Sequence, residues 1–205
     1  SSWAWKYDPK HLIFSLARYK FVSKMFDNFD NVLEVGAGDG FKSQIVKQTV
    51  KNLTLCDSEN INLKIYNSKE NNYSKCKFIL HDFIKKDLKK KYDGIYLLDV
   101  LEHISKKYEA IFIKNICKSL RKDSVLIVGI PTIESQKYAS KLVKKNHINC
   151  KSKKELGLYM SKFFKNVFMF SMNDEILHTG FDKMSNYIFA LCVNKKWKKK
   201  YFALI

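Results

Sequence analysis

The chain has 205 residues, which is enough for one sizeable hydrophobic core and too few for two comfortable domains. Its formal net charge is +18, but only Arg18 and Arg121 among its 38 basic residues are arginine. Nucleic-acid readers generally use arginine for bidentate contacts, so the charge favours a small anionic or polar metabolite over nucleic acid as the partner.

Helical and strand patterns alternate through the first half of the chain. Leu12, Leu16 and Tyr19 recur at steps of three and four residues, which is the spacing of an amphipathic helix. Short apolar runs bounded by turn residues then indicate buried strands. In chain order, the pattern predicts a helix over 10–26, a strand over 31–35, a helix over 41–50, a strand over 53–57, a polar helix to about residue 71 and a strand over 77–82.

The same alternation continues through the second half. Pro131 ends the fifth strand because proline has no backbone N–H to donate. Gly180 lies between the last two strands and suits an antiparallel, hairpin-like end. The pattern predicts a strand over 93–99, a helix over 107–120, a strand over 124–130, helices over 135–144 and 153–164, and strands over 166–172 and 186–193.

Strands that alternate with helices predict an α/β fold in which a parallel sheet is covered on both faces. We expect a Rossmann-like sheet of seven strands, mostly parallel, with an antiparallel last strand. Residues 1–205 form one domain in this interpretation, with an N-terminal helical cap over 1–30 and a helical insertion on the substrate side over 131–165. Right-handed crossovers bring the carboxyl ends of the parallel strands to one edge, where ligands bind in such sheets.

A glycine-rich turn, Gly36-Ala37-Gly38-Asp39-Gly40, follows the first predicted strand and precedes a helix. Glycines at such a turn allow positive φ and close approach of the backbone to a ligand. A dinucleotide fingerprint would place the third glycine at position 41, where this chain has Phe, so a nicotinamide oxidoreductase is disfavoured. The loop instead reads G-x-G-x-G, with Glu34 two residues before it.

This loop resembles the motif of class I S-adenosylmethionine-dependent methyltransferases, and the resemblance covers residues 30–130. The cofactor has a zwitterionic methionine tail and a sulfonium, so an acid near the loop makes physical sense. The resemblance implies a Rossmann-like class I methyltransferase fold, with S-adenosylmethionine as cofactor and S-adenosylhomocysteine as product. It also implies that the cofactor is contacted by Glu34, Gly36, Ala37, Gly38 and Gly40.

Acids at the ends of the second and third strands support the resemblance. Asp57, followed by Ser58, ends the second strand, where a carboxylate can accept hydrogen bonds from both ribose hydroxyls. Asp82 and Phe83 follow the third strand. The acid can meet the adenine amine there, and the aromatic ring can pack on the adenine. We therefore expect all four residues to contact the cofactor.

The fourth strand ends in the run D-V-L-E-H-I, in which Asp99 and Val100 are further expected cofactor contacts. This run is similar to a segment of small-molecule methyltransferases of the ubiquinone-biosynthesis type. Glu102 in the same run is expected to be solvated or to start a helix.

The flanks resemble a narrower group of bacterial methyltransferases, over residues 7–11, 17–21, 134–140 and 171–181. Proteins of that group accompany surface-saccharide pathways. The resemblance therefore implies an acceptor oxygen on a sugar, a nucleotide sugar or a phosphorylated metabolite. Arg18 lies on a helix that can fold over the cofactor, and we expect it to bind the cofactor carboxylate or an anionic group of the substrate.

The chain has five histidines, and histidine is the best-suited base near neutral pH for assisting proton removal from a hydroxyl acceptor. The topology places His103, His147 and His178 near the ligand edge. Our hypothesis is that His147 or His178 serves as the base or orients the acceptor. His11 and His81 are expected to be structural.

We expect no metal site. The five cysteines are scattered without a Cys-x-x-Cys pair, as is typical of buried thiols in a reducing compartment. Asp174, Glu175 and His178 lie close in sequence, but a polar loop that contacts substrate is the favoured interpretation.

Sequence patterns also indicate a cytoplasmic protein. No apolar run approaches the roughly 18–20 residues of a membrane-spanning helix, and residues 1–5 lack the layout of a signal peptide. The basic segment 195–202 leaves room for a weak contact with an anionic surface.

Two alternative functions stay open. The first is an RNA methyltransferase, although the fourth strand is followed by no proline-containing motif of the kind used for amino-group methylation of bases. The second is a non-catalytic partner subunit that only binds the cofactor, against which the intact glycine loop and acids argue. The identity of the methyl acceptor lies beyond these residues.

Overall fold

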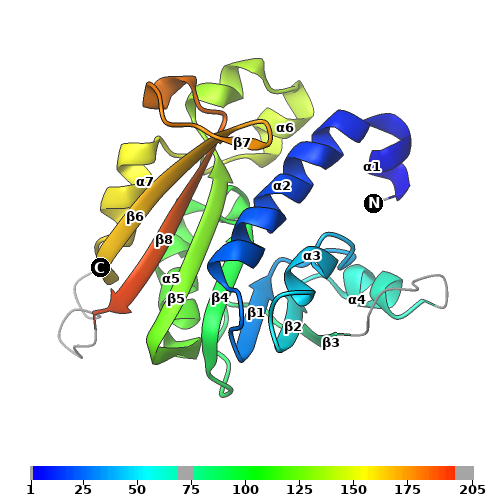
Figure 1. Cartoon of the computed structure of the whole chain (residues 1–205), viewed down its shortest axis with the longest axis vertical. Helices are drawn as coiled ribbons and strands as arrows, with labels where there is room; N and C mark the ends of the chain where they lie inside the picture. Colours follow the sequence, from blue (N-terminus) through cyan, green and yellow to red (C-terminus); the bar gives the residue numbers. More distant parts are fainter. Residues whose placement is uncertain (1, 69–75, 197–205) are drawn as a thin grey trace.

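The computed structural model describes residues 2–68 and 76–196 of the chain. Its strands are β1 Asn31–Val35, β2 Asn52–Asp57, β3 Lys77–Leu80, β4 Tyr92–Leu98, β5 Leu120–Pro131, β6 Phe164–Asn173, β7 Ile176–Leu177 and β8 Tyr187–Lys195. They form one sheet in the order β3-β2-β1-β4-β5-β8-β6-β7 (Figure 1).

Strands β1 to β5 are parallel, and β8 is antiparallel to both of its neighbours, β5 and β6. The prediction of a mostly parallel sheet with an antiparallel last strand is therefore confirmed. The eighth strand is the two-residue β7, which pairs with β6 at the edge of the sheet.

The helices lie near their predicted positions but several are shorter. They are α1 Ser2–Tyr7, α2 Pro9–Met25, α3 Gln44–Lys47, α4 Asn60–Tyr66, α5 Lys106–Ser119, α6 Lys141–Asn146 and α7 Lys153–Met160, with 3₁₀ turns η1 Leu101–His103, η2 Glu134–Tyr138 and η3 Asp182–Met184.

Helix α3 is much shorter than the helix predicted over 41–50. The Asp39 side chain accepts the Phe41 N–H at 3.1 Å, and Gln44 and Ile45 donate to carbonyls three residues back. Tight turns of this kind satisfy the first donors after the glycine loop, so the α-helix begins only at Gln44.

Two hydrophobic clusters lie on opposite faces of the sheet. Along β4, Ile95 and Leu97 join one cluster, while Tyr96 and Leu98 join the other, as the alternation of side chains in a strand requires. Helices α5 and α7 pack on the first face, and α2 and α3 pack on the second (Figure 1). Because both faces are covered, the central strands are apolar along nearly their whole length.

Lysines at the start of the basic C-terminal segment are bound within the fold. The Lys195 ammonium donates to the carbonyls of Cys117 and Leu120, and the Lys196 ammonium donates to the carbonyl of Ser161. Residues 197–202, the rest of the segment for which a surface contact was expected, lie outside the described residues. Within 2–68 and 76–196, no helix combines the length and apolarity needed to cross a membrane.

A buried carboxylate joins three elements of the core. Glu34 of β1 accepts a hydrogen bond from Tyr19 of α2 at 2.8 Å and one from Tyr96 of β4 at 2.6 Å. All three side chains are buried. Burial raises the pKa of Glu34 above its usual range, while the hydrogen bonds from the tyrosine hydroxyls act in the opposite direction.

We predict that Tyr96→Phe lowers the free energy of unfolding by about 1–3 kcal/mol, because one oxygen of a buried acid loses its donor. The folded-state pKa of Glu34 already lies above the unfolded value, so this acid costs stability as pH rises through the folded pKa. Removing a donor raises that pKa further. The loss should therefore be larger at pH 8 than at pH 5.

Urea denaturation of Tyr96→Phe at both pH values tests this. Tyr108→Phe, on the exposed side of α5, is the matched control and should behave as the wild type. An equal loss at the two pH values would contradict the role given to Glu34.

Candidate active site

The glycine loop brings the ends of β1 and β4 into close contact. Gly36, Gly38 and Gly40 all have positive φ. A Cβ built on Gly36 would lie 2.3 Å from Val100 Cγ2, so only glycine fits beside the end of β4. A Cβ on Gly38 would meet nothing within 4 Å. The loop is thus packed against the protein at Gly36 and open at Gly38.

Asp57 is fixed at the end of β2 by backbone donors. One carboxylate oxygen accepts the Gly38 N–H at 2.9 Å, and the other accepts the Glu59 N–H at 2.9 Å. Each oxygen keeps a further lone pair with which it can accept a hydrogen bond from a hydroxyl group. Ser58, next to it, is exposed. The arrangement suits an acid that binds the two hydroxyls of a ribose beside the open side of the loop.

Of the two predicted site residues after β3, Asp82 lies at the edge of the sheet and Phe83 points into the core. Asp82 accepts the Ile84 N–H at 2.8 Å and keeps part of its carboxylate exposed. The Phe83 side chain is only 2% exposed and packs edge-on against His81 and Phe112. Its ring therefore faces the core rather than an adenine, and any contact of Phe83 with a nucleoside would come from its backbone.

Glu34 was expected to contact the cofactor, but it lies deeper in the protein than such a contact requires. Both of its oxygens accept tyrosine hydroxyls beneath the loop, and the side chain is buried. Because it is enclosed, Glu34 supports the strands and helix around the site instead of presenting a carboxylate at its surface.

Arg18 and Asp99 form an ion pair where β4 ends. Arg18 Nη1 lies 3.0 and 3.1 Å from the two Asp99 oxygens, and its guanidinium stacks on the Tyr187 ring at 3.9 Å from the centroid. Burial acts to raise the pKa of Asp99, but Arg18 and Lys42 outweigh it and the pKa is lowered. Arg18 Nε has no acceptor among the described residues and stays available to an anionic group.

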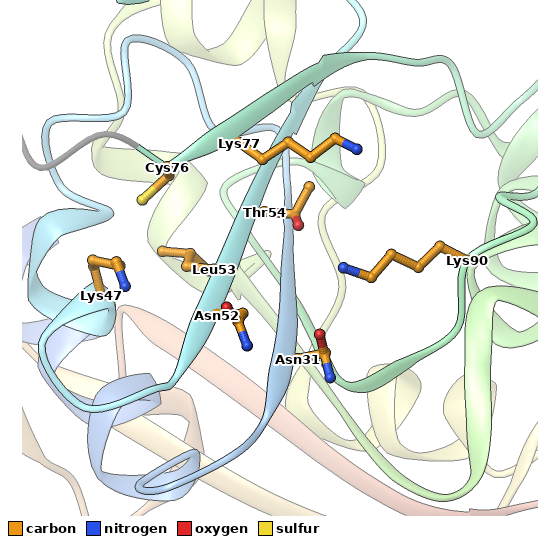
Figure 2. A pocket seen from close by; sticks show the side chains of 8 residues that line it. All are labelled: Asn31, Lys47, Asn52, Leu53, Thr54, Cys76, Lys77 and Lys90. Carbon is orange, nitrogen blue, oxygen red and sulfur yellow. The ribbon is translucent and has the colours of Figure 1, made fainter.

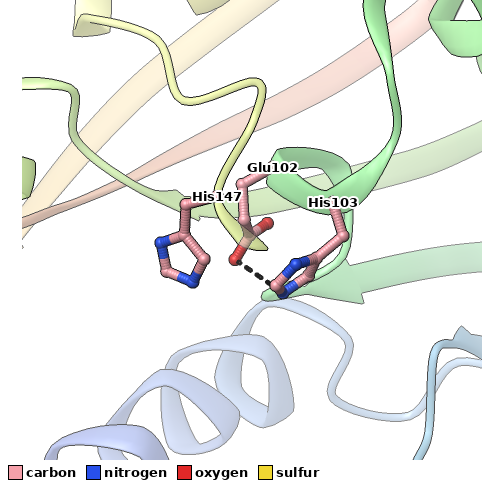
Figure 3. Close-up of side chains that lie close together, drawn as sticks. All are labelled: Glu102, His103 and His147. Carbon is pink, nitrogen blue, oxygen red and sulfur yellow. Dashed lines mark ion pairs between the residues drawn. The ribbon is translucent and has the colours of Figure 1, made fainter. Parts of the chain in front are cut away.

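A carboxylate and two imidazoles come together just beyond Asp99 (Figure 3). Glu102 and His103 lie on η1, and His147 follows α6. One ligand atom from each residue lies within 4.8 Å of the other two. Glu102 is 0% exposed, so it is not solvated, but it lies in the first turn of η1, which agrees with the expectation that it starts a helix.

The electrostatics of this cluster are set by burial. Burial, followed by the nearby Asp99 charge, raises the pKa of Glu102 well above its usual range. Burial, followed by His103, lowers the pKa of His147, so its ring is neutral near pH 7. A neutral imidazole keeps a lone pair with which to accept a proton or bind a cation.

His178 is held within its own hairpin. Its Nδ1 lies 3.1 Å from Asn173 Nδ2, and its Nε2 lies 2.9 Å from the Phe181 carbonyl oxygen. Asp174 accepts a hydrogen bond from Asn186 in the same region. Over residues 2–68 and 76–196, the Glu102 cluster alone brings three His, Cys, Asp or Glu ligand atoms together closely enough for a metal, so the 174–178 group does not qualify.

The other two histidines occupy different surroundings. His81 Nε2 lies 2.9 Å from the Lys86 carbonyl oxygen, in a loop contact of the structural kind expected. His11 lies near the ion pair. Burial, followed by the Arg18 charge, lowers the pKa of its imidazole. Lys42 and Tyr187, which also act on Asp99, were missed by sequence reasoning. Only folding brings their segments to this edge.

The buried cysteine thiols have low reactivity. Burial raises the pKa of Cys56, Cys117 and Cys150 to about 12 in each case. A thiol with such a pKa is protonated near neutral pH and is a poor nucleophile.

A basic cavity of about 320 Å³ lies at the opposite edge of the sheet (Figure 2). Its lining includes Asn31, Asn52 and Lys77, the first residues of β1, β2 and β3, together with Lys47 and Lys90. It contains none of the predicted site residues, so the amino edge and the carboxyl edge of the sheet are distinct surfaces.

The residues at the carboxyl edge fit S-adenosylmethionine. The space at Gly38 admits a ligand, Asp57 presents two fixed acceptors, and Asp82 is partly exposed. Arg18 Nε is a buried donor without an acceptor among the described residues, as expected if a carboxylate completes it.

Comparisons with known proteins give the family. A family model described as a methyltransferase domain matches residues 6–165 of the chain. No curated protein sequence matches it.

Solved structures share the fold at low sequence identity. The methyltransferase domain of bacterial CtHen1-C is 15% identical, with a TM-score of 0.71 over 88% of this chain and 98% of that one. The plantazolicin methyltransferase BpumL, in complex with SAH, is 15% identical, with a TM-score of 0.69 over 96% and 88%. The N-methyltransferase NodS from Bradyrhizobium japonicum WM9, in complex with S-adenosyl-L-homocysteine, is 16% identical, with a TM-score of 0.65 over 88% and 84%.

The family match spans well over half of the chain and includes the glycine loop, Asp57, Asp82, Asp99 and Glu102. It confirms the prediction of a methyltransferase, and the cofactor-bound neighbours agree with S-adenosylmethionine as its cofactor. The chain therefore belongs to the methyltransferase domain family and has the fold of class I S-adenosylmethionine-dependent methyltransferases.

Proposed function

We propose that this protein transfers a methyl group from S-adenosylmethionine to an oxygen of a small polar acceptor. The observation that carries the proposal is the convergence, at one edge of the sheet, of a nucleoside-binding arrangement around Asp57 and a histidine-rich cluster around Glu102. The acceptor would be a sugar, a nucleotide sugar or a phosphorylated metabolite in bacterial surface-saccharide biosynthesis, a reaction that we assign to the cytoplasm.

On the cofactor side, Asp57 binds the ribose hydroxyls and Asp82 the adenine amine. Arg18 binds the methionine carboxylate through the donors that Asp99 leaves free. The loop backbone lies along the cofactor where the missing side chain of Gly38 leaves room. Glu34 lies beneath the loop and holds the strands and the helix around the cofactor in place. The remaining cofactor contacts that we assign come from Gly36, Ala37, Gly40, Ser58, Val100 and the backbone of Phe83.

On the acceptor side, the chain's own groups assist the loss of a proton. S-adenosylmethionine supplies a methyl group on a positively charged sulfur, and an acceptor oxygen displaces that sulfur in line. A hydroxyl becomes a better nucleophile as its proton leaves. His103 Nε2 faces the buried Glu102, and His147 has a ring nitrogen in the same cluster. We assign both imidazoles to assisting that loss. We assign His178 to positioning the acceptor, because its ring is held by Asn173 and Phe181.

The acceptor class rests on charge and on the flanking segments. The net charge of +18 favours an anionic or phosphate-bearing molecule. Residues 134–140 and 171–181 resemble the saccharide-associated group. They include η2, the end of β6, the β6–β7 turn and β7. We propose that residues 1–30 and 131–165 form the walls that select this acceptor.

We predict that Asp57→Asn weakens binding of S-adenosylhomocysteine at least about tenfold, because two charge-assisted hydrogen bonds to the ribose lose their charge. Calorimetric titration of wild type and variant measures this. Asp87→Asn, which alters a half-buried acid on the segment after β3, is the matched control. Equal affinities in wild type and Asp57→Asn, or binding of NAD alone, would contradict the assigned cofactor site.

We further predict turnover with saccharide-type acceptors, detected as release of S-adenosylhomocysteine from a panel of sugars, nucleotide sugars and sugar phosphates. In single-turnover reactions, His103→Asn and His147→Asn should each be slower by about 100-fold or more, with cofactor affinity within twofold of wild type.

Methylation of RNA with a salt-sensitive gel shift would instead favour the RNA methyltransferase. Tight cofactor binding without turnover on any acceptor class would favour the non-catalytic subunit. Full activity in both histidine variants would contradict the role given to the cluster.

A further inference from the structure

The cluster of Glu102, His103 and His147 has the composition of a metal site. It offers one carboxylate and two imidazoles, with one ligand atom of each within 4.8 Å of the others. Figure 3 shows the carboxylate between the two rings, with His147 arriving from a segment more than forty residues later in the chain. The fold therefore brings together three ligands that local sequence does not.

In both rings, the hydrogen bond to another described residue is made by Nδ1. His103 Nδ1 lies 3.0 Å from the Asn146 carbonyl oxygen, which can only accept, so Nδ1 carries the proton. His147 Nδ1 lies 3.1 Å from Gln136 Oε1. The Gln136 amide nitrogen lies 3.3 Å from the Thr132 carbonyl, which fixes the amide with its oxygen toward the ring.

Both rings therefore carry their lone pair on Nε2. A histidine that donates its other N–H to a carbonyl or carboxylate is the usual arrangement around a bound metal, because it fixes the tautomer and the orientation of the ring. His103 Nε2 faces Glu102 Oε1 at 4.0 Å, so the free nitrogen points toward the carboxylate.

Glu102 supplies an independent observation. Its side chain is 0% exposed, and neither carboxylate oxygen accepts a hydrogen bond from another described residue. Buried polar groups are ordinarily partnered, and an unpartnered acid costs free energy. A cation bound beside Glu102 would supply the close partner that His103 Nε2, at 4.0 Å, does not.

We propose that Glu102, His103 and His147 bind one divalent transition-metal cation, of the class of Mn²⁺, Fe²⁺, Co²⁺ or Zn²⁺. Two imidazole ligands favour these ions over Mg²⁺ and Ca²⁺, which prefer oxygen. Two ligands on one ion lie at most about 4.2 Å apart at metal–ligand distances near 2.1 Å. Binding therefore requires a small inward rotation, which the His103 side chain, 44% exposed, can make.

The role of this cation rests on the proposed function. Three protein ligands leave coordination positions open for an acceptor hydroxyl, whose O–H bond is weakened on the metal. With the cation bound, the Nε2 lone pairs of His103 and His147 are metal ligands, so the two histidines assist proton loss through the metal and not as bases. The proton passes to water, and the oxygen lone pair forms the new C–O bond. The C–S bond breaks and its electron pair stays on sulfur as the neutral thioether. This proposal replaces the sequence-based expectation that the chain holds no metal.

The test is titration of tag-free, metal-free protein with Co²⁺ alone, followed by visible absorption and calorimetry. The expected result is one bound Co²⁺ per chain. Glu102→Gln, His103→Asn and His147→Asn should each weaken its affinity at least about tenfold, since even outer partners of a metal site contribute that much. His178→Asn is the matched control and should bind as tightly as wild type.

Glu102→Gln is nearly isosteric, so it tests the site without creating a cavity, and urea denaturation verifies that each variant is folded. Absence of stoichiometric Co²⁺ binding, or unchanged affinity in all three cluster variants, would overturn the metal site.

S-adenosylhomocysteine titrated into the same metal-free protein separates this proposal from the proposed function. Cofactor binding without Co²⁺ binding would overturn the metal site and leave the methyltransferase function standing. Co²⁺ binding that depends on the three residues, without cofactor binding, would support the metal site and overturn the proposed function.

Discussion

The buried Glu34 carboxylate is the interaction on which the geometry of the site depends. Its two oxygens accept the hydroxyls of Tyr19 and Tyr96, and so join α2 to β1 and β4. Arg18 precedes Tyr19 on the helix, and Asp99 follows three residues after Tyr96. Holding the tyrosines in place therefore also sets the guanidinium against the aspartate. The Glu34 carboxylate is inaccessible to any ligand, but it thus determines where the charges of Arg18 and Asp99 lie.

The second constraint is the close approach of the ends of β1 and β4. Gly36 lies so near Val100 that a side chain in its place would separate the two strand ends. Asp99, immediately before Val100, has positive φ, and its N–H donates to the Gly129 carbonyl. These unusual backbone conformations turn the chain sharply at the edge. The turns leave room beside Gly38 and direct η1 toward His147.

Asp57 and Glu102 are two buried acids at the carboxyl edge of the sheet. Their carboxylates suit different ligands because their surroundings differ. Asp57 is held by two backbone N–H groups, so its carboxylate is a fixed, preorganised acceptor. Glu102 accepts no hydrogen bond from another described residue, and its side chain is buried. The Asp57 carboxylate is held by its two backbone donors in one orientation, in which it can accept hydrogen bonds from hydroxyl groups. Among the described residues, Glu102 has only His103 Nε2, at 4.0 Å, beside its carboxylate, which is why we propose a cation as its ligand.

The sequence by itself determined the elements and the edge at which they act. Alternation of short apolar runs with helical spacing predicted β1 to β6 and β8, because these signals are local. The glycine spacing with Asp57 and Asp82 likewise predicted the edge to which we assign the cofactor. Only the tertiary structure decided that Phe83 faces the core, that α3 begins as late as Gln44, and that Glu102 is enclosed beside His103 and His147. Burial and pairing of this kind depend on segments that meet only when the sheet and its helices pack, so no local pattern encodes them.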